Sequence, residues 1–182
     1  MGMRKRAFLF CALAACALAV SAQSYSLRSN ILGLATTNLN LEASMTLNRK
    51  WSLHLPVQYN PFKFGRNRQF RNFYAAPGVR YWLLESYMGG FIGMYGTAGM
   101  YSVGNLFGSK YRYEGEGYGV GLSVGKAYQI GRRWNLEWEV GAGAVWLAYD
   151  KYLCKRCGDL VDSDYGWHFL PTRAALNLVY LF

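Results

Sequence analysis

Apolar and polar residues alternate with a period of two along most of the chain, a pattern typical of β-strands with one apolar and one polar face. In the clearest segment, apolar residues occupy every second position from Trp134 to Trp146, and Glu137 and Glu139 lie between them. The alternation predicts eight strands, of which the first and fifth are the least regular. They are segments 25–36, 39–47, 51–59, 73–83, 89–103, 117–125, 134–146 and 174–182.

The distribution of charge over the two faces favours a membrane barrel over a soluble sandwich. No charge interrupts the apolar face, and the polar face carries too few charges for a fully solvated exterior. In lipid every backbone group must be paired, which a closed sheet with an apolar exterior achieves. We therefore predict an all-β fold, a closed eight-stranded antiparallel transmembrane β-barrel. The expected inward charges are Glu42, Arg80, Glu137, Glu139, Arg173 and a less certain Arg28.

The predicted connections alternate in length, as they do in bacterial outer-membrane barrels with short periplasmic turns and longer external loops. The short turns are 48–50, 85–90 and 131–133, and the long loops are 60–72, 104–112 and 150–166. Three prolines fall inside predicted strands. Because proline lacks the N–H that a ladder needs, we expect bulges or rim positions at Pro56, Pro77 and Pro171.

The N-terminus is typical of a secretory signal peptide, with a basic start followed by an apolar run from Ala7 to Val20. Cleavage after Ala22 would leave residues 23–182 as one barrel domain. A second interpretation stays open, because residues 13–16 resemble a lipoprotein signal that would leave Cys16 lipidated. Loss of the three basic signal residues lowers the net charge from +10 to about +7. For a secreted basic chain we expect anionic lipid or polysaccharide as partner, and no nucleic acid.

The last strand runs to the end of the chain and carries Tyr180 and Phe182 on its apolar face. This ending resembles the closing strand of bacterial outer-membrane barrels, which the barrel-assembly machinery recognises. The resemblance implies that Tyr180 and Phe182 form an assembly signal.

The inward charges have two interpretations. They could form a polar conduit or a catalytic carboxylate pair, or they could form a paired ionic plug. An eight-stranded barrel is just wide enough to be filled by side chains, so the plug is favoured. Glycines at every second position of segment 115–125 would leave room for arginine and tyrosine side chains.

Enzymatic chemistry is the minority interpretation. The two histidines are His54 and His168, and Ser163, Asp162 and Asp164 lie near His168 in the sequence. No spacing fixes a catalytic geometry among them. Cys154 and Cys157 form half of a zinc site at most, and in an oxidising compartment a disulfide is favoured. We predict no metal or other cofactor.

The predicted loop 60–72 interleaves basic and aromatic residues. Such a loop could bind the phosphates of lipid A or an acidic glycan, or it could rest in the anionic outer leaflet without a specific ligand. Its basic residues are Lys63, Arg66, Arg68 and Arg71.

Several short motifs resemble a family of small outer-membrane barrel proteins from Bacteroidota that is catalogued as a domain of unknown function. The resemblance implies the fold and a place in the cell outer membrane, and it brings no activity. We expect a non-enzymatic barrel that contacts lipopolysaccharide and possible envelope partners. The alternatives are a lipid A-modifying or hydrolytic enzyme, or a subunit of a fimbrial or glycan-handling assembly. The motifs are Asn40-Leu41-Glu42, Lys50-Trp51-Ser52-Leu53, Tyr59-Asn60-Pro61-Phe62, Arg80-Tyr81-Trp82, Arg133-Trp134-Asn135-Leu136-Glu137, Asp150-Lys151-Tyr152-x-Cys154-x-x-Cys157-Gly158 and Pro171-Thr172.

Overall fold

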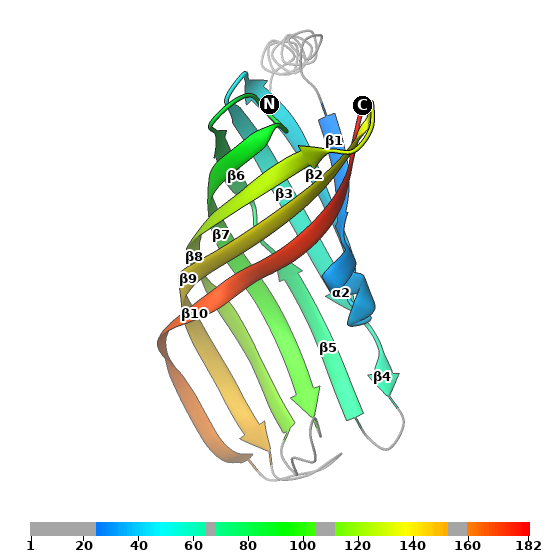
Figure 1. Cartoon of the computed structure of the whole chain (residues 1–182). Helices are drawn as coiled ribbons and strands as arrows, with labels where there is room; N and C mark the ends of the chain where they lie inside the picture. Colours follow the sequence, from blue (N-terminus) through cyan, green and yellow to red (C-terminus); the bar gives the residue numbers. More distant parts are fainter. Residues whose placement is uncertain (1–24, 65–67, 105–111, 153–159) are drawn as a thin grey trace, which may run out of the picture.

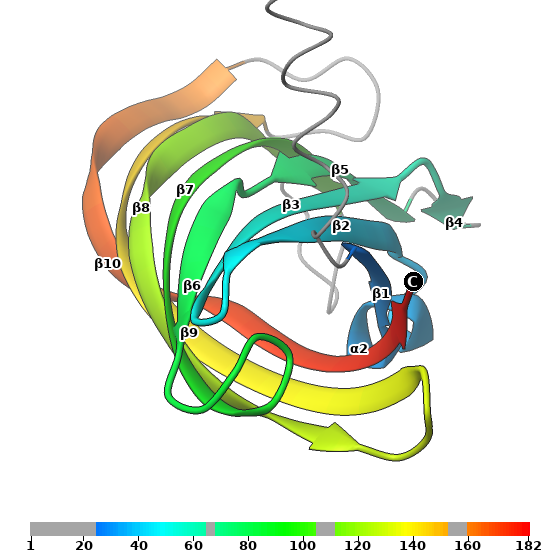
Figure 2. The same cartoon turned by 90° about the horizontal axis from the view of Figure 1, so that it is seen from above.

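The computed structural model describes residues 25–64, 68–104, 112–152 and 160–182, and these residues form one antiparallel sheet rolled into a barrel (Figures 1 and 2). The elements are β1 (Tyr25–Asn30), α2 (Ile31–Ala35), β2 (Leu39–Asn48), β3 (Trp51–Asn60), β4 (Lys63–Phe64), β5 (Arg68–Ala75), β6 (Gly78–Trp82), β7 (Gly89–Gly104), β8 (Arg112–Gln129), β9 (Trp134–Tyr152) and β10 (Leu160–Leu181).

The sheet closes as a barrel of eight strands, as predicted. β5 and β6 together form one strand, because both pair with β3 on one side and with β7 on the other. The two-residue β4 pairs with β5 alone and extends one hairpin. β1 pairs with both β2 and β10 and so joins the first and last strands.

The two faces of the sheet have the predicted character. On β8 the outward residues Tyr118, Val120 and Leu122 are 56–62% exposed. On β9 the inward residues Glu137 and Glu139 are each 1% exposed. The barrel therefore has an apolar exterior and a polar interior, the reverse of a soluble barrel.

The first predicted strand is shorter than expected. The strand prediction for 25–36 holds only to Asn30, and Ile31–Ala35 form the short helix α2. The Asn30 side chain accepts a hydrogen bond from the Leu32 N–H at 3.1 Å, which is the geometry of a helix N-cap. This cap ends the strand, a local effect that alternation of apolar residues does not report.

The long connections are shorter than predicted, because strands extend into them. β9 continues to Tyr152 and β10 begins at Leu160, inside the predicted loop 150–166. β4 and β5 likewise form a hairpin within the predicted loop 60–72. In these extensions polar and aromatic residues occur on both faces of the sheet, so the period-2 signal fades while the strand ladder continues.

Two of the three prolines interrupt the ladder as predicted. Pro77 lies in the break between β5 and β6, and the register of β9 and β10 shifts between Pro171 and Arg173. At Pro56 the prediction of a bulge or rim position was wrong on the side that pairs with β2, because Pro56 lies opposite Glu42 in regular register. On its other side β3 changes partner here, and the Ala76 N–H donates to the Pro56 carbonyl at 3.2 Å.

The barrel has a short-turn end and a long-loop end, at the top and bottom of Figure 1 respectively. The last residue lies at the short-turn end, where the Phe182 N–H donates to the Tyr25 carbonyl at 2.9 Å. Among the described residues, no helix is long and apolar enough to cross a membrane.

Candidate functional site: a charged layer inside the barrel

Six charged side chains from five strands meet inside the barrel, and we call them the charged layer. It contains three guanidinium groups and three carboxylates, so its formal charges balance. The layer includes every inward charge predicted from the sequence, with Arg28 as a full member. Its residues are Arg28 on β1, Glu42 on β2, Arg80 on β6, Glu137 and Glu139 on β9 and Arg173 on β10.

The two carboxylates of β9 each bridge two arginines. Glu137 Oε1 lies 2.6 Å from Arg28 Nη1 and 2.8 Å from Arg80 Nη1. Glu139 contacts Arg80 Nη2 at 2.6 Å and Arg173 Nη1 at 3.1 Å. Because β9 residues two apart point to the same side, one strand supplies both bridging groups. Arg80 is therefore held by both carboxylates.

Glu42 completes the layer from the opposite wall of the barrel. Its carboxylate lies 3.5 Å from Arg28 Nε, 3.2 Å from Arg80 Nη2 and 3.4 Å from Arg173 Nη2. Each guanidinium thus contacts two or more carboxylates. Desolvated charges need this degree of pairing, since an unpaired ion in such a place is costly.

A hydrogen-bond chain extends the layer toward the short-turn end. The indole N–H of Trp82 donates to Ser52 Oγ at 2.7 Å, and Ser52 Oγ lies 2.6 Å from His54 Nε2. His54 Nδ1 lies 2.8 Å from Glu42 Oε1. Sequence reasoning missed this chain. The signal was present, because Ser52 and His54 share the polar face of one strand and a tight turn at 48–50 pairs that strand with β2.

The order serine, histidine, glutamate is that of hydrolytic triads, but the surroundings leave a substrate no room. Ser52 is 0% exposed and its hydroxyl already contacts both Trp82 and His54. Neither Ser52 nor His54 lines any of the three cavities of about 620, 450 and 100 Å³ that the described residues form. The hydrogen-bond chain from Trp82 through Ser52 and His54 therefore holds the Glu42 carboxylate in place.

Aromatic side chains fill the barrel between the charged layer and the short-turn end. Trp82 packs against Phe91 and Tyr87, with ring centroids 4.8 and 5.7 Å apart. Tyr87 reaches inward from the turn between β6 and β7 with a φ of 67°. The Asn135 amide donates to its carbonyl at 2.7 Å and holds the turn in place. The Arg80 guanidinium lies 4.5 Å above the Phe91 ring.

Inward glycines give these large side chains their space. A methyl group at Gly121 would lie 2.6 Å from the Tyr95 ring, and one at Gly125 would lie 2.4 Å from the Phe91 ring. Both are closer than carbon atoms approach without displacement. The predicted room for a tyrosine side chain is confirmed at Gly121, whereas the side chain beside Gly125 is a phenylalanine, which was not predicted.

The serine, histidine and aspartates near the C-terminus are not brought together. His168 lies opposite Val145 on the inner face, and Asp164 lies opposite Tyr149 on that same face. Ser163 lies opposite Asp150 and points outward. Because these residues alternate along one strand, Ser163 and His168 lie on opposite faces of the sheet.

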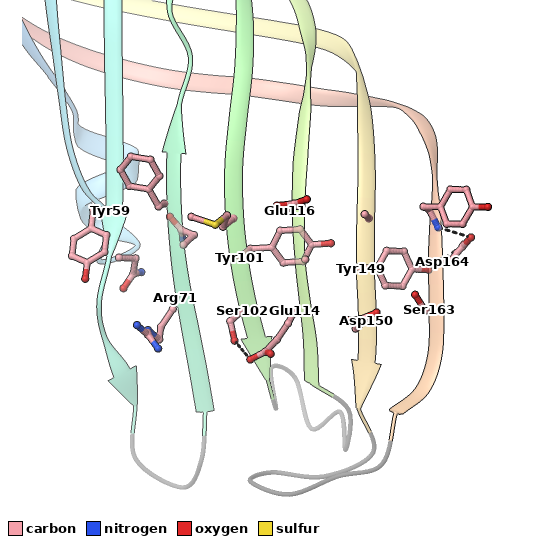
Figure 3. Close-up of a pocket in the computed structure, with 17 residues that line it drawn as sticks. Tyr59, Arg71, Tyr101, Ser102, Glu114, Glu116, Tyr149, Asp150, Ser163 and Asp164 are labelled. Carbon is pink, nitrogen blue, oxygen red and sulfur yellow. Dashed lines mark hydrogen bonds between the residues drawn. The ribbon is translucent and has the colours of Figure 1, made fainter.

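Polar residues replace apolar ones on the outer face close to the long-loop end. Figure 3 shows this polar row crossing five strands at one level, along the edge of a depression of about 620 Å³. Ser102 Oγ donates to Glu114 Oε1 at 2.9 Å within the row. The row marks the limit of the apolar band toward the long-loop end. Its members are Arg71, Ser102, Glu114, Asp150 and Ser163.

Several predicted residues lie outside the described residues: the signal peptide 1–22 with Cys16, Arg66, and the candidate disulfide of Cys154 and Cys157. Lys63 is part of β4 and Arg68 part of β5, and the two strands pair in one hairpin. Arg71 is exposed on the outer face. In the described ranges, no cluster of three or more His, Cys, Asp or Glu residues could hold a metal ion.

Comparison with known proteins identifies the family of the chain. Residues 7–182 match the family described as "Protein of unknown function (DUF3575)", and the chain belongs to it. No curated protein and no solved structure matches the chain. The resemblance to a family of unknown function is confirmed, whereas its Bacteroidota and outer-membrane attribution stays a prediction.

Proposed function

We propose that this member of the family is an integral protein of the cell outer membrane, with lipopolysaccharide around its outer half. One observation carries the proposal, namely the reversed distribution of polarity over the barrel. Leu41, Val120 and Leu122 are 56–62% exposed, while Arg28, Arg80 and Glu137 are 1–2% exposed. A bilayer is the solvent in which such a barrel buries its apolar exterior.

The dimensions of the apolar band support this placement. Every outward residue of β9 from Trp134 to Ala148 is uncharged. This stretch is long enough to cross a membrane, because a membrane-spanning strand needs about 9–11 residues. Aromatic pairs lie near both limits of the band. The Trp134 and Tyr180 rings are 5.0 Å apart near the short-turn end, and the Trp146 and Trp167 rings are 5.7 Å apart toward the long-loop end. Such rings suit the two membrane interfaces.

The proposed role is non-enzymatic, with the long-loop end contacting envelope or external partners. The charge balance within the layer and the full burial of Ser52 support a structural interior. The separation of Ser163 from His168 speaks against a hydrolytic site on β10. The basic β4–β5 hairpin, with Lys63, Arg68 and the exposed Arg71, lies at the end where anionic lipopolysaccharide would surround the barrel.

We further propose that the interior is closed to ions. Planar-bilayer recordings of the purified barrel are expected to show no stable conductance, because the charged layer and the aromatic side chains on its short-turn side are almost fully buried. Removing one negative charge from the layer with Glu139→Gln should not open a path, since the aromatic side chains remain. Reproducible ion-selective openings that this variant alters would contradict the proposal.

Deletion of Phe182 is expected to lower the yield of barrel in the outer membrane more than it lowers intrinsic stability. The Phe182 side chain is 64% exposed, and the deletion removes one ring contact with Tyr180 and one N–H hydrogen bond to Tyr25, so little packing is lost. The lower membrane yield would instead come from weaker recognition by the barrel-assembly machinery. Membrane yield in cells is compared with refolding yield in detergent, and Phe182→Tyr serves as control. Equal yields of the deletion and the unaltered chain in cells would refute this assembly role.

A further inference from the structure

A second cavity lies inside the barrel on the long-loop side of the charged layer, and we call it the outer chamber. Its volume is about 450 Å³. A smaller cavity of about 100 Å³ continues from it to the charged layer, where Glu42 and Arg173 line its floor. Gln58, Tyr74 and Thr172 line both cavities, so the two spaces meet at these residues.

One wall of the outer chamber is apolar. Val145 and Leu147 continue the inward face of β9 beyond Glu137 and Glu139, and Leu170 lies on the inward face of β10. Leu170 is 39% exposed although it faces the interior. Exposure of these apolar side chains is unfavourable if the outer chamber is filled by water alone. They suit an apolar occupant.

The inner end of the chamber presents an unused hydrogen-bonding group. The Tyr74 hydroxyl is buried and has no hydrogen-bond partner among the described residues. Tyr74 itself lines both cavities. A buried hydroxyl without a partner is destabilising, and a ligand atom that accepts its hydrogen bond removes that cost.

The wall beside Leu170 is an open strand edge. Between Leu160 and Leu176, β10 pairs only with β9 in the part of the chain that the structure describes. β1 leaves the sheet at Asn30, whose amide donates to the Ala174 carbonyl at 3.3 Å and accepts from the Leu176 N–H at 3.2 Å. Figure 1 shows β10 continuing past α2 toward the long-loop end. The outer chamber reaches this edge at residues 170–172.

We propose that the outer chamber binds a single-chain amphipathic molecule with an uncharged polar head. The apolar tail packs against Val145, Leu147 and Leu170, and the head accepts a hydrogen bond from Tyr74. An uncharged head fits because the charges of the adjacent charged layer are already balanced. Entry occurs past the β10 edge from the outer leaflet, a route that rests on the proposed membrane placement.

The test uses the full mature chain in phosphatidylcholine nanodiscs, with 1-monolauroylglycerol as probe and laurate as its charged counterpart. The methyl resonances of Val145 and Leu147 are followed by NMR during titration. Saturable shifts with 1-monolauroylglycerol, and weaker binding of laurate, are expected. Absence of any saturable shift in a barrel that still shows heat-modifiable gel mobility would overturn the chamber proposal and leave the membrane proposal intact.

Two matched pairs of variants locate the tail and the head. Leu170→Trp should abolish the saturable shift by occupying the space of the tail, whereas Leu178→Trp, at a similarly exposed outward position, should not. Equal behaviour of these two variants would contradict the assigned site.

Tyr74→Phe should raise Kd about threefold to tenfold, the range of one ordinary hydrogen bond, whereas the outward control Tyr118→Phe should not. The unfolding midpoint of Tyr74→Phe should not fall, because the hydroxyl has no partner in the protein itself. A lower midpoint with unchanged Kd would assign Tyr74 a structural role and overturn its role in binding.

Discussion

Replacing Glu137 by Gln is expected to lower the free energy of unfolding in lipid or detergent by about 3–5 kcal/mol. Glutamine keeps the shape of the side chain but removes the charge that Arg28 and Arg80 contact at 2.6 and 2.8 Å. Both guanidinium groups are almost fully buried, so water cannot replace the lost partner. The charged layer would hold three cations and two anions.

The exposed ion pair of Arg49 and Glu85 provides the matched control, because its side chains are 86% and 53% exposed. Glu85→Gln should leave stability unchanged within error, since solvent screens such pairs. Adding Arg28→Gln to Glu137→Gln restores the charge balance. The double variant should therefore lose less than the sum of the two single losses. Urea titration measures all four variants, and equal small losses for Glu137→Gln and Glu85→Gln would contradict the paired layer.

Replacing Leu122 by Arg is expected to destabilise the barrel by about 2–4 kcal/mol, the cost of an arginine on the lipid face near the membrane midplane. Leu122 is 62% exposed and lies on the outer face between the outward charges Glu116 and Lys126 of the same strand. In a soluble protein the same exchange at an exposed position would change stability by only about 0.5 kcal/mol or less. The two environments therefore predict different results.

Ser163→Arg is the control for Leu122→Arg, because Ser163 lies outward in the polar row at the edge of the band. Near the interface the cost of an arginine falls to about 0–1 kcal/mol. Unfolding free energies in vesicles of defined thickness measure both variants. Equal effects at Leu122 and Ser163 would show that no lipid surrounds the apolar band.

The alternation of residue types was sufficient to predict the barrel and its inward charges. Side chains two positions apart share a face, so Glu137 and Glu139 had to point to the same side. Closure then brings Glu42 and Arg173 to the same interior, because an eight-stranded barrel is narrow. The contacts of these residues follow from strand register, which the tight turn at 48–50 sets for β2 and β3.

Other features depend on local or long-range geometry that the alternation does not encode. Asn30 ends β1 by capping α2, and its amide also bonds to the edge of β10. Tyr87 occupies the interior only because the turn before β7 bends inward. The outer chamber reaches the β10 edge beside the bulge at Pro171 and beyond the early end of β1, two irregularities far apart in the sequence.

Fractionation of cells that express the full chain with its own N-terminus tests the membrane placement most directly. An integral barrel is expected to stay with the outer membrane after extraction with alkaline carbonate. It is also expected to migrate differently on gels before and after boiling. Recovery of the folded chain in the periplasmic fraction without detergent would contradict the membrane placement.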